Sequence, residues 1–319
     1  MGIKVLIQSS LVTGDVEELR RNLPQVEIVV SRSDEEIPSL ISDADVFFGI
    51  LSPEIYAAAK NLKWLQALSA GVEWLADIPG ASESDLIVTN TRGAHAQTIA
   101  EHTFALILSL TRMVKAHLRD QIARDWEPKR YLGQMQGLAG KTMGIVGLGQ
   151  IGSAIVRRAH GFEMDIYAVD AVPFPHEPHL RQRWGLDGTD ELCRIADFLV
   201  ISAPLTPGSR GLIDARRIGL MKPSAYVIAV SRGNIVDEQA LIAALQEGRL
   251  AGAGLDVTAV EPPPADSPLW DMENVVMTPH DSPVSDRTFD WVWRIFAENL
   301  SRYVNGTPLF NIVNKRAGY

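Results

Sequence analysis

The sequence predicts an α/β protein built from two doubly wound parallel sheets. Short apolar runs alternate with segments of helical spacing along most of the chain, a pattern typical of parallel sheets. One of these runs leads directly into a glycine-rich turn at residues 147–152, which is followed by a helical pattern. The chain has 319 residues, a length that corresponds to about two domains.

Composition and charge narrow the class of protein. Hydrophobic residues make up 46% and charged residues 22% of the chain, which is ordinary for a globular protein. The net charge of −9 argues against general binding to nucleic acid or to anionic membranes. Cys193 is the single cysteine, which excludes an internal disulfide and fits a reducing compartment. Since there is no signal-peptide pattern and no apolar run of membrane length, we expect a cytoplasmic protein.

The first hundred residues predict a small α/β unit. Helical spacing with a polar face predicts helices at 15–22 and 53–60. Five apolar runs predict parallel strands at 4–8, 27–30, 46–50, 64–68 and 86–89.

A long helix is predicted next. Thr98 and Glu101 have the spacing of a capping box, so we expect the helix to begin at Thr98. Apolar residues continue on more than one face as far as Leu118, which predicts a helix buried between domains or at a subunit interface. His102 lies within it and is interpreted as a helix residue rather than a ligand. Residues 126–140 are predicted to form a loop.

The glycine-rich turn is the strongest single motif. It follows an apolar run at 142–146, which predicts a buried strand. The first glycine permits a tight turn, the second lets a pyrophosphate approach the backbone, and the third lets the next helix pack closely. The N-terminus of that helix offers N–H groups and a partial positive charge to phosphates. The residues predicted to bind the cofactor here are Gly147, Gly149, Gln150, Ile151 and Gly152.

An acid after the next strand indicates which dinucleotide is bound. The apolar run at 165–169 ends in Asp170, at a distance from Gly152 that suits hydrogen bonds to the adenine ribose. Asp170 would repel a 2′-phosphate, so NAD is favoured over NADP. Arg181 and Arg183 in the following predicted loop leave NADP open. The alternative interpretation is a glycine-rich connector followed by a surface Asp.

No metal site is predicted. His176, Glu177 and His179 lie close together, but Pro178 interrupts the helix that a His-Glu-x-x-His site needs.

The second half of the chain carries polar residues directly after its predicted strands. The strands are predicted at 198–202, 226–230, 254–257 and 275–277. Arg232, Glu261 and His280 follow three of these strands. Because ligands of parallel sheets bind beyond the carboxyl ends of the strands, the three form a plausible catalytic set. Taken singly, a surface Arg, a loop Glu and a His that caps a turn are the ordinary alternatives.

Four motifs follow one another along the chain: GIVGLGQIG, SRGNIVDEQALIAAL, AGAGLDVTAVEP and SPLWDMENVVMTPH. With them, nearly the whole chain resembles the D-isomer-specific 2-hydroxyacid dehydrogenases. The resemblance implies a flavodoxin-like substrate domain of residues 1–98 and 286–319, and a Rossmann NAD-binding domain of residues 99–285. It also implies a homodimer held through the cofactor domain and an active site in the cleft between the domains.

The same resemblance implies roles for individual residues. In the reduction of a 2-keto acid, His280 would donate a proton to the carbonyl oxygen, and Glu261 would favour the protonated imidazole. Arg232 would grip the substrate carboxylate with its planar fork. Asp256 would position the nicotinamide carboxamide. The substrate would also bind to the N–H groups of Ser69, Ala70, Gly71 and Val72, and the cofactor cleft would be lined by Ala203, Pro204 and Val230.

Two departures from the family pattern concern the substrate. Asp281, Ser282 and Pro283 follow the catalytic His, where the family usually has small aliphatic residues. Arg92 stands where the family often has proline. We hypothesise that Arg92 favours substrates with a second anionic group; a solvent-exposed surface Arg is the alternative.

These observations predict an NAD(H)-dependent oxidoreductase that interconverts a small 2-keto acid and its D-2-hydroxy acid. Glyoxylate, hydroxypyruvate and pyruvate are the expected keto acids. Oxidation of 3-phosphoglycerate is less expected, because the sequence ends at Tyr319 without room for a regulatory domain. Two alternatives remain: an NADP-preferring glyoxylate or hydroxypyruvate reductase, and a nucleotide-sensing binding module on the same scaffold.

Overall fold

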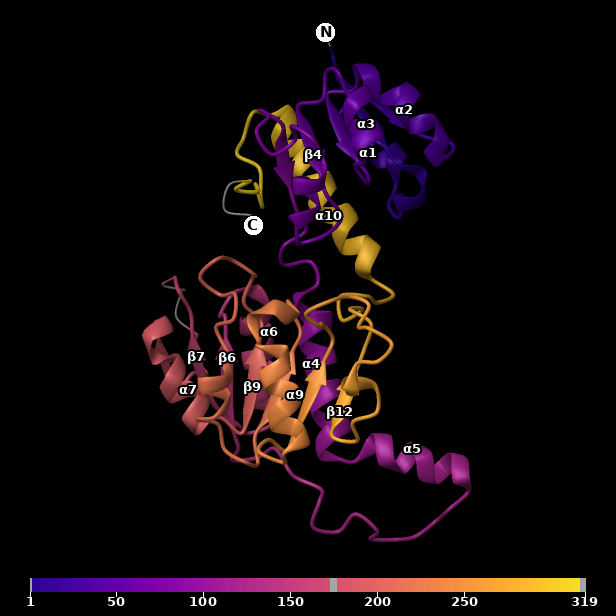
Figure 1. Cartoon of the computed structure of the whole chain (residues 1–319). Coiled ribbons are helices and arrows are strands. Elements are labelled where there is room, and N and C mark those ends of the chain that lie inside the picture. The colour runs from indigo at the N-terminus through magenta and orange to yellow at the C-terminus, as the bar shows by residue number, and fades with distance from the viewer. Residues whose placement is uncertain (1, 173–176, 316–319) are drawn as a thin grey trace. The chain divides into compact units, whose positions relative to one another are not determined.

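The computed structural model describes residues 2–172 and 177–315, and within them both sheets are entirely parallel (Figure 1). The predicted fold class is confirmed. The chain divides into two compact units: unit 1, formed by residues up to His95 together with those from Val284 onward, and unit 2, Ala96–Pro283. These limits lie two or three residues from the domain boundaries expected from the sequence, 98/99 and 285/286.

Unit 1 contains a sheet whose described strands run in the order β2-β1-β3-β4-β5. The strands are β1 (Ile3–Ile7), β2 (Val26–Val30), β3 (Val46–Phe48), β4 (Trp64–Gln66) and β5 (Ile87–Thr89). The α-helices are α1 (Val16–Asn22), α2 (Ile37–Leu40), α3 (Pro53–Ala58) and α10 (Thr288–Val304). All five predicted strands are present, although β3 and β4 each end two residues before the expected limit.

Helix α10 brings the C-terminal part of the chain back to the sheet of unit 1. Its apolar face packs on β1, β3 and β4. The rings of Phe48 and Phe296 stack there with centroids 4.3 Å apart and planes inclined by 6°. Trp293 lies so close to Gly14 that a Cβ on this glycine would be 1.9 Å from the indole nitrogen. Trp293 is therefore a core residue of unit 1.

Unit 2 contains a larger sheet, with its described strands in the order β12-β11-β10-β9-β6-β7-β8. The strands are β6 (Thr142–Val146), β7 (Asp165–Val169), β8 (Gln182–Trp184), β9 (Phe198–Ile201), β10 (Tyr226–Ala229), β11 (Gly252–Leu255) and β12 (Val275–Met277). The α-helices are α4 (Ala96–Thr111), α5 (Val114–Ala123), α6 (Gln150–Gly161), α7 (Thr189–Ile195), α8 (Ala215–Ile218) and α9 (Glu238–Gln246). Apolar residues of α4 and α6 share one core with the sheet, and those of α7, α8 and α9 share another.

The order of the strands in unit 2 explains where a ligand can bind. The chain begins the sheet at β6, adds β7 and β8 on one side, and then adds β9 to β12 on the other. The order thus reverses between β6 and β9, which is where open parallel sheets bind their ligands. The glycine-rich turn follows β6, and Arg232, Glu261 and His280 follow β10, β11 and β12.

The predicted long helix is two helices, and its expected start is wrong. Helix α4 begins at Ala96, so Thr98 is inside it, and its hydroxyl donates to the carbonyl oxygen of Pro283 (3.4 Å). Glu101 forms an ion pair with Arg158 (2.7 Å) instead of capping the helix. Met113, with a φ of +56°, separates α4 from α5. No helix in the described part of the chain has both the length and the hydropathy to cross a bilayer.

A short strand was not predicted. Arg183 lies in β8, which pairs in parallel with β7, rather than in a loop. Strand β8 is an edge strand, and its sequence Gln-Arg-Trp has no apolar run from which a strand could be predicted.

Candidate active site

The glycine-rich turn after β6 has no room for a side chain at two of its glycines. Gly147 has a φ of +95°, and a Cβ there would lie 2.5 Å from the backbone of Ala203. A Cβ at Gly152 would lie 2.3 Å from the carbonyl oxygen of Gly147, so this glycine sets how closely α6 approaches β6. A Cβ at Gly149 would meet nothing within 4 Å. The backbone directly before α6 is therefore open to an approaching phosphate.

Neighbouring strand ends hold this turn in place. Ser202, after β9, donates from Oγ to the carbonyl oxygen of Gly147 (2.7 Å). Asp170, after β7, accepts from the backbone N–H of Leu148 (2.6 Å) and of Val172 (2.8 Å), one at each carboxylate oxygen. Each oxygen has further lone pairs, so Asp170 can also accept from ribose hydroxyls. The turn and its acid fit the adenosine half of a dinucleotide.

Arg183 lies in β8, the strand next to the one that Asp170 follows. Its Nη2 donates to the carbonyl oxygen of Val172, and its buried Nε has no hydrogen-bond partner among the described residues. Arg181 is bound elsewhere, because its Nε donates to Asp165 at the start of β7 (2.8 Å). Of these two arginines, only Arg183 bonds to the segment that is anchored by Asp170.

His280 and Glu261 are directly hydrogen-bonded. Nδ1 of His280 lies 2.7 Å from Oε2 of Glu261, and Oε1 of Glu261 accepts from the backbone N–H of Thr258 (3.2 Å). The two side chains are 37% and 39% exposed, so both are accessible to a ligand. With Nδ1 directed at the carboxylate, Nε2 of His280 is the ring nitrogen that can transfer a proton.

Arg232 follows the neighbouring strand. It is half-buried, and its Nη1 donates to the carbonyl oxygen of Ser231 (2.7 Å). Because β10 and β11 are adjacent in the sheet, the segments that carry Arg232 and Glu261 leave neighbouring strand ends.

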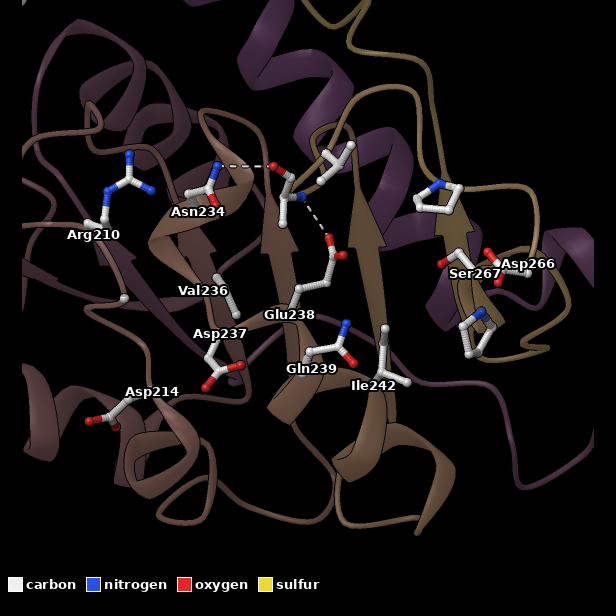
Figure 2. Close-up of a pocket in the computed structure, with 15 residues that line it drawn as sticks. Arg210, Asp214, Asn234, Val236, Asp237, Glu238, Gln239, Ile242, Asp266 and Ser267 are labelled. Atoms are coloured by element: carbon white, nitrogen blue, oxygen red, sulfur yellow. Dashed lines mark hydrogen bonds between the residues drawn. The ribbon is translucent and has the colours of Figure 1, made fainter.

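The loop that carries Glu261 is held by the segment after β10. The backbone N–H of Ala259 donates to Glu238 (2.7 Å), and its carbonyl oxygen accepts from Nδ2 of Asn234 (3.1 Å). Figure 2 labels Asn234 and Glu238 and draws the two bonds as dashed lines. Gly233 packs so closely on this loop that a Cβ would lie 2.1 Å from the carbonyl carbon of the residue before Ala259. Gly233, Asn234 and Glu238 therefore fix the path of the loop that carries Glu261.

A cavity of about 570 Å³ lies beside this contact (Figure 2). Its charged lining residues are Arg210, Asp214, Asp237, Glu238 and Asp266. Neither Glu261 nor His280 is among the described residues that line it, so the cavity is distinct from the candidate active site.

Asp256 is buried at the end of β11 and faces the turn that carries His280. Its Oδ1 accepts from the hydroxyl of Thr278 (2.7 Å) and from the backbone N–H of Asp281 (3.1 Å). Its Oδ2 accepts from the backbone N–H of Ser282 (3.1 Å). The backbone N–H groups of Asp281 and Ser282 thus help to anchor the turn of His280, independently of the side chains that depart from the family pattern.

Unit 1 also contains residues that are expected to bind substrate. They lie on the loop after β4. In the described part of the chain, the N–H groups of residues 69–72 donate to no protein acceptor. The loop is held by its carbonyl groups instead, because Asn90 donates from Nδ2 to Ala70 (2.7 Å) and Thr91 donates from its backbone N to Ser69 (3.2 Å). Arg92, on the following turn, is exposed.

The structure adds residues that the sequence did not single out. Glu238 and Asn234 lie within the motif SRGNIVDEQALIAAL, which is the one signal that could have identified them. Thr278 and His102 are linked by a hydrogen bond of 2.8 Å between Oγ1 and Nε2, although no spacing in the sequence connects them.

One group of side chains in the described residues has metal-ligand spacing. His102, Asp256 and Asp281 offer ligand atoms within 4.8 Å of one another. Oδ1 of Asp256 already accepts two hydrogen bonds, and Nε2 of His102 is hydrogen-bonded to Thr278, so we assign no metal to this group. His176, in the segment from which a metal site was excluded, lies outside the described residues.

The fold and this geometry define the class of protein. A glycine-rich turn where the strand order reverses, with an acid anchored to it, is the arrangement of dinucleotide-binding α/β proteins. Residues 104–282 match the model of the D-isomer specific 2-hydroxyacid dehydrogenase family, NAD binding domain. The chain therefore belongs to this family, and the resemblance seen in its motifs is confirmed.

Individual relatives agree with this assignment. A D-3-phosphoglycerate dehydrogenase of Methanocaldococcus jannaschii is 33% identical over 98% of the chain, which spans only 59% of that relative's length. A glyoxylate reductase of Korarchaeum cryptofilum is 34% identical over 86% of the chain and 84% of the relative. The fold also resembles the crystal structure of a D-isomer specific 2-hydroxyacid dehydrogenase from Xanthobacter autotrophicus in complex with NADPH and MES. The two structures superpose with a TM-score of 0.79 and 28% sequence identity, over 100% of this chain and 99% of the Xanthobacter chain.

Proposed function

We propose that this protein is an NAD(H)-dependent oxidoreductase that interconverts a small 2-keto acid and its D-2-hydroxy acid. The observation that carries the proposal is the His280–Glu261 pair, at 2.7 Å, on the sheet edge that also bears the glycine-rich turn. A cytoplasmic location is part of the proposal and is supported by Cys193, a single and fully buried cysteine.

His280 is the proposed proton donor. Its protonated imidazole would transfer the Nε2 proton to the carbonyl oxygen of the keto acid, and in oxidation Nε2 would accept the hydroxyl proton. Glu261 holds Nδ1 and, as a carboxylate, favours the charged imidazole. When bound, the reduced nicotinamide supplies the hydride.

Arg232 and the loop after β4 are proposed to bind the substrate carboxylate. A guanidinium presents two parallel N–H donors that match a carboxylate, which a Lys cannot do. The N–H groups of Ser69, Ala70, Gly71 and Val72 would bind the second carboxylate oxygen, and their lack of protein acceptors in the described residues supports this role. Arg92 would favour substrates with a second anionic group.

The cofactor is proposed to be NAD. Asp170, anchored to the turn through Leu148, would accept from the ribose hydroxyls and repel a 2′-phosphate. Ala203, Pro204 and Val230 would line the cofactor cleft. NADP is the second candidate, supported by the buried Nε of Arg183 near Asp170 and by the NADPH bound to the Xanthobacter relative. Asp256, expected from the sequence to position the nicotinamide carboxamide, has a fully inaccessible side chain that accepts from Thr278, Asp281 and Ser282, so we propose that it acts through the turn of His280 rather than by direct contact.

One assay tests the reaction. Absorbance of the reduced nicotinamide is followed with NADH and with NADPH against glyoxylate, hydroxypyruvate, pyruvate and a dicarboxylic keto acid. Turnover of at least one acid with NADH is expected. Thermal stabilisation by nucleotide without turnover of any acid would instead favour a nucleotide-sensing module.

We also propose a homodimer held through the cofactor-binding unit. Helix α5 and the loop after it lead away from the sheet (Figure 1) and expose large apolar side chains: Leu118 (52%), Ile122 (84%), Trp126 (91%) and Leu132 (77%). Ion pairs within this segment hold the loop against α5: Arg130 pairs with Glu127 (2.7 Å) and with Asp120 of the helix (2.6 Å). Ordered apolar side chains of this size are typical of protein interfaces.

A further inference from the structure

The buried carboxylate of Asp256 depends on the turn of His280 for its hydrogen bonds. Its side chain is fully inaccessible, and a buried carboxylate without donors would be strongly destabilising. Within residues 2–172 and 177–315, its carboxylate accepts from Thr278, Asp281 and Ser282, on both sides of His280. In addition, the backbone N–H of His280 donates to the carbonyl oxygen of Asp256 (2.9 Å). The proton donor is thus anchored to the end of β11.

The backbone of His280 needs this anchoring. Its φ is +55°, in the left-handed region that is unfavourable for a residue with a Cβ. Such a conformation persists when the surrounding contacts fix it. If the bonds to Asp256 loosened, the turn could relax and the imidazole would move relative to Glu261.

His102 completes this arrangement from helix α4. The single hydroxyl proton of Thr278 is directed to Asp256 (2.7 Å), so Thr278 must accept from Nε2–H of His102 (2.8 Å). The same Nε2 lies 3.6 Å from Oδ1 of Asp256. His102 therefore fixes the direction of the Thr278 hydroxyl and adds positive potential beside the buried carboxylate.

We infer that His102 and Thr278 are positioning residues, which keep His280 in its proton-donating place through the carboxylate of Asp256. The inference rests on the proposed function, because it assigns His280 as the proton donor. Neither residue needs to touch the substrate. Their loss should therefore lower kcat for keto-acid reduction and leave KM nearly unchanged, since misplacement of a reacting group by about 1 Å can cost a factor of ~10² in rate.

Single substitutions at Thr278 and His102 in the whole chain test this. We expect Thr278→Val, which removes only the hydroxyl, to lower kcat about tenfold, and we expect Thr278→Ser to restore it. His102→Leu should lower kcat by about the same factor. His102→Gln should restore part of kcat, because its amide can donate a hydrogen bond. Both residues act through the same hydrogen bond to Asp256. The double variant His102→Leu/Thr278→Val should therefore lower kcat no more than either single variant does. His160→Leu, on α6, is the control that should leave kcat unchanged.

Wild-type kcat in Thr278→Val, or equal losses in Thr278→Ser and Thr278→Val, would overturn the inference. Amide hydrogen exchange gives a readout that does not require turnover. Exchange at His280, Asp281 and Ser282 should become faster in Thr278→Val, while exchange in β11 stays the same. Unchanged exchange at the three amides would also overturn the inference. If the unsubstituted protein reduces no keto acid, the proposed function fails, and the exchange experiment still decides whether Thr278 holds the turn.

Discussion

Nδ1 of His280 and Oε2 of Glu261 lie 2.7 Å apart although the two residues are 19 positions apart in the sequence. The pair forms because β11 and β12 are neighbouring parallel strands whose carboxyl ends meet at one edge. A positioned general acid typically contributes a factor of about 10²–10⁴ to the rate of an enzyme, which is the role that we propose for His280.

His280→Ala should therefore lower kcat for keto-acid reduction by about 10²–10⁴, and NADH should still bind with nearly the same Kd. Glu261→Gln should have a smaller effect, because the amide can still accept from Nδ1–H but carries no charge. Steady-state kinetics and a nucleotide titration measure the two quantities. Turnover by His280→Ala at the rate of the unsubstituted protein would remove His280 from the mechanism.

Asp170→Ala should narrow the preference for NAD over NADP, because it removes both the ribose acceptor and the negative charge that repels a 2′-phosphate. We expect the ratio of kcat/KM for the two cofactors to fall by about tenfold, the factor for a loss of roughly 1.4 kcal/mol. Arg183→Ala is the matched comparison and should reduce activity with NADPH more than with NADH. If Asp170→Ala leaves the ratio unchanged, the ribose is recognised by other residues.

The strands and the edge that bears the candidate site could be predicted from the sequence because they depend on local patterns. Apolar runs mark the buried strands β6, β9 and β10, and polar residues follow where the strands end. Strand β8 could not be predicted, since an edge strand made of Gln, Arg and Trp has no such pattern. The break at Met113 could not be predicted either, because the chain turns there without glycine or proline.

The contacts that support the candidate site could not be predicted from the sequence either, because they join residues that are far apart along the chain. Glu238 binds the backbone of Ala259, and His102 binds Thr278 across 176 residues. A side chain that bonds to a distant segment leaves no period or spacing in a single sequence. In the sequence, Glu238 resembles any acid in the first turn of a helix, and His102 resembles any polar residue on a helix.

Glu238→Ala should lower kcat for keto-acid reduction several-fold, because a hydrogen bond to a charged group, worth about 1.5–3 kcal/mol, would no longer hold the loop of Glu261. Glu238→Gln retains an acceptor and should have a weaker effect. Gln239→Ala, the next residue on α9 and also in the lining of the cavity, is the control and should behave like the unsubstituted protein. Equal kinetics for Glu238→Ala and Gln239→Ala would show that the hydrogen bond between Glu238 and Ala259 does not matter for catalysis.

Cys193 should be unreactive in the folded protein. Burial raises the pKa of its thiol to about 12, so it stays neutral at pH 8, and the thiolate is the reactive form. In the unfolded chain the thiol ionises near pH 8.5, so its contribution to stability should be present below that pH and decline as the pH rises toward 12. A thiol-specific reagent should label about one group per chain only after denaturation. Rapid labelling of the native protein at pH 8 would contradict this.

Ile122 and Trp126 should be buried when two copies of the chain associate. Both are among the most exposed large apolar residues, and Ile122 lies one helical turn beyond Leu118 on α5. Glu in place of either residue would put an unpaired charge into a desolvated interface, which is strongly unfavourable. We therefore expect Ile122→Glu and Trp126→Glu to shift sedimentation from dimer toward monomer, while Lys129→Glu, on the same loop but polar already, changes it less. A protein that sediments as a monomer without any substitution would refute the dimer, and a dimer unaffected by both variants would place its interface on another surface.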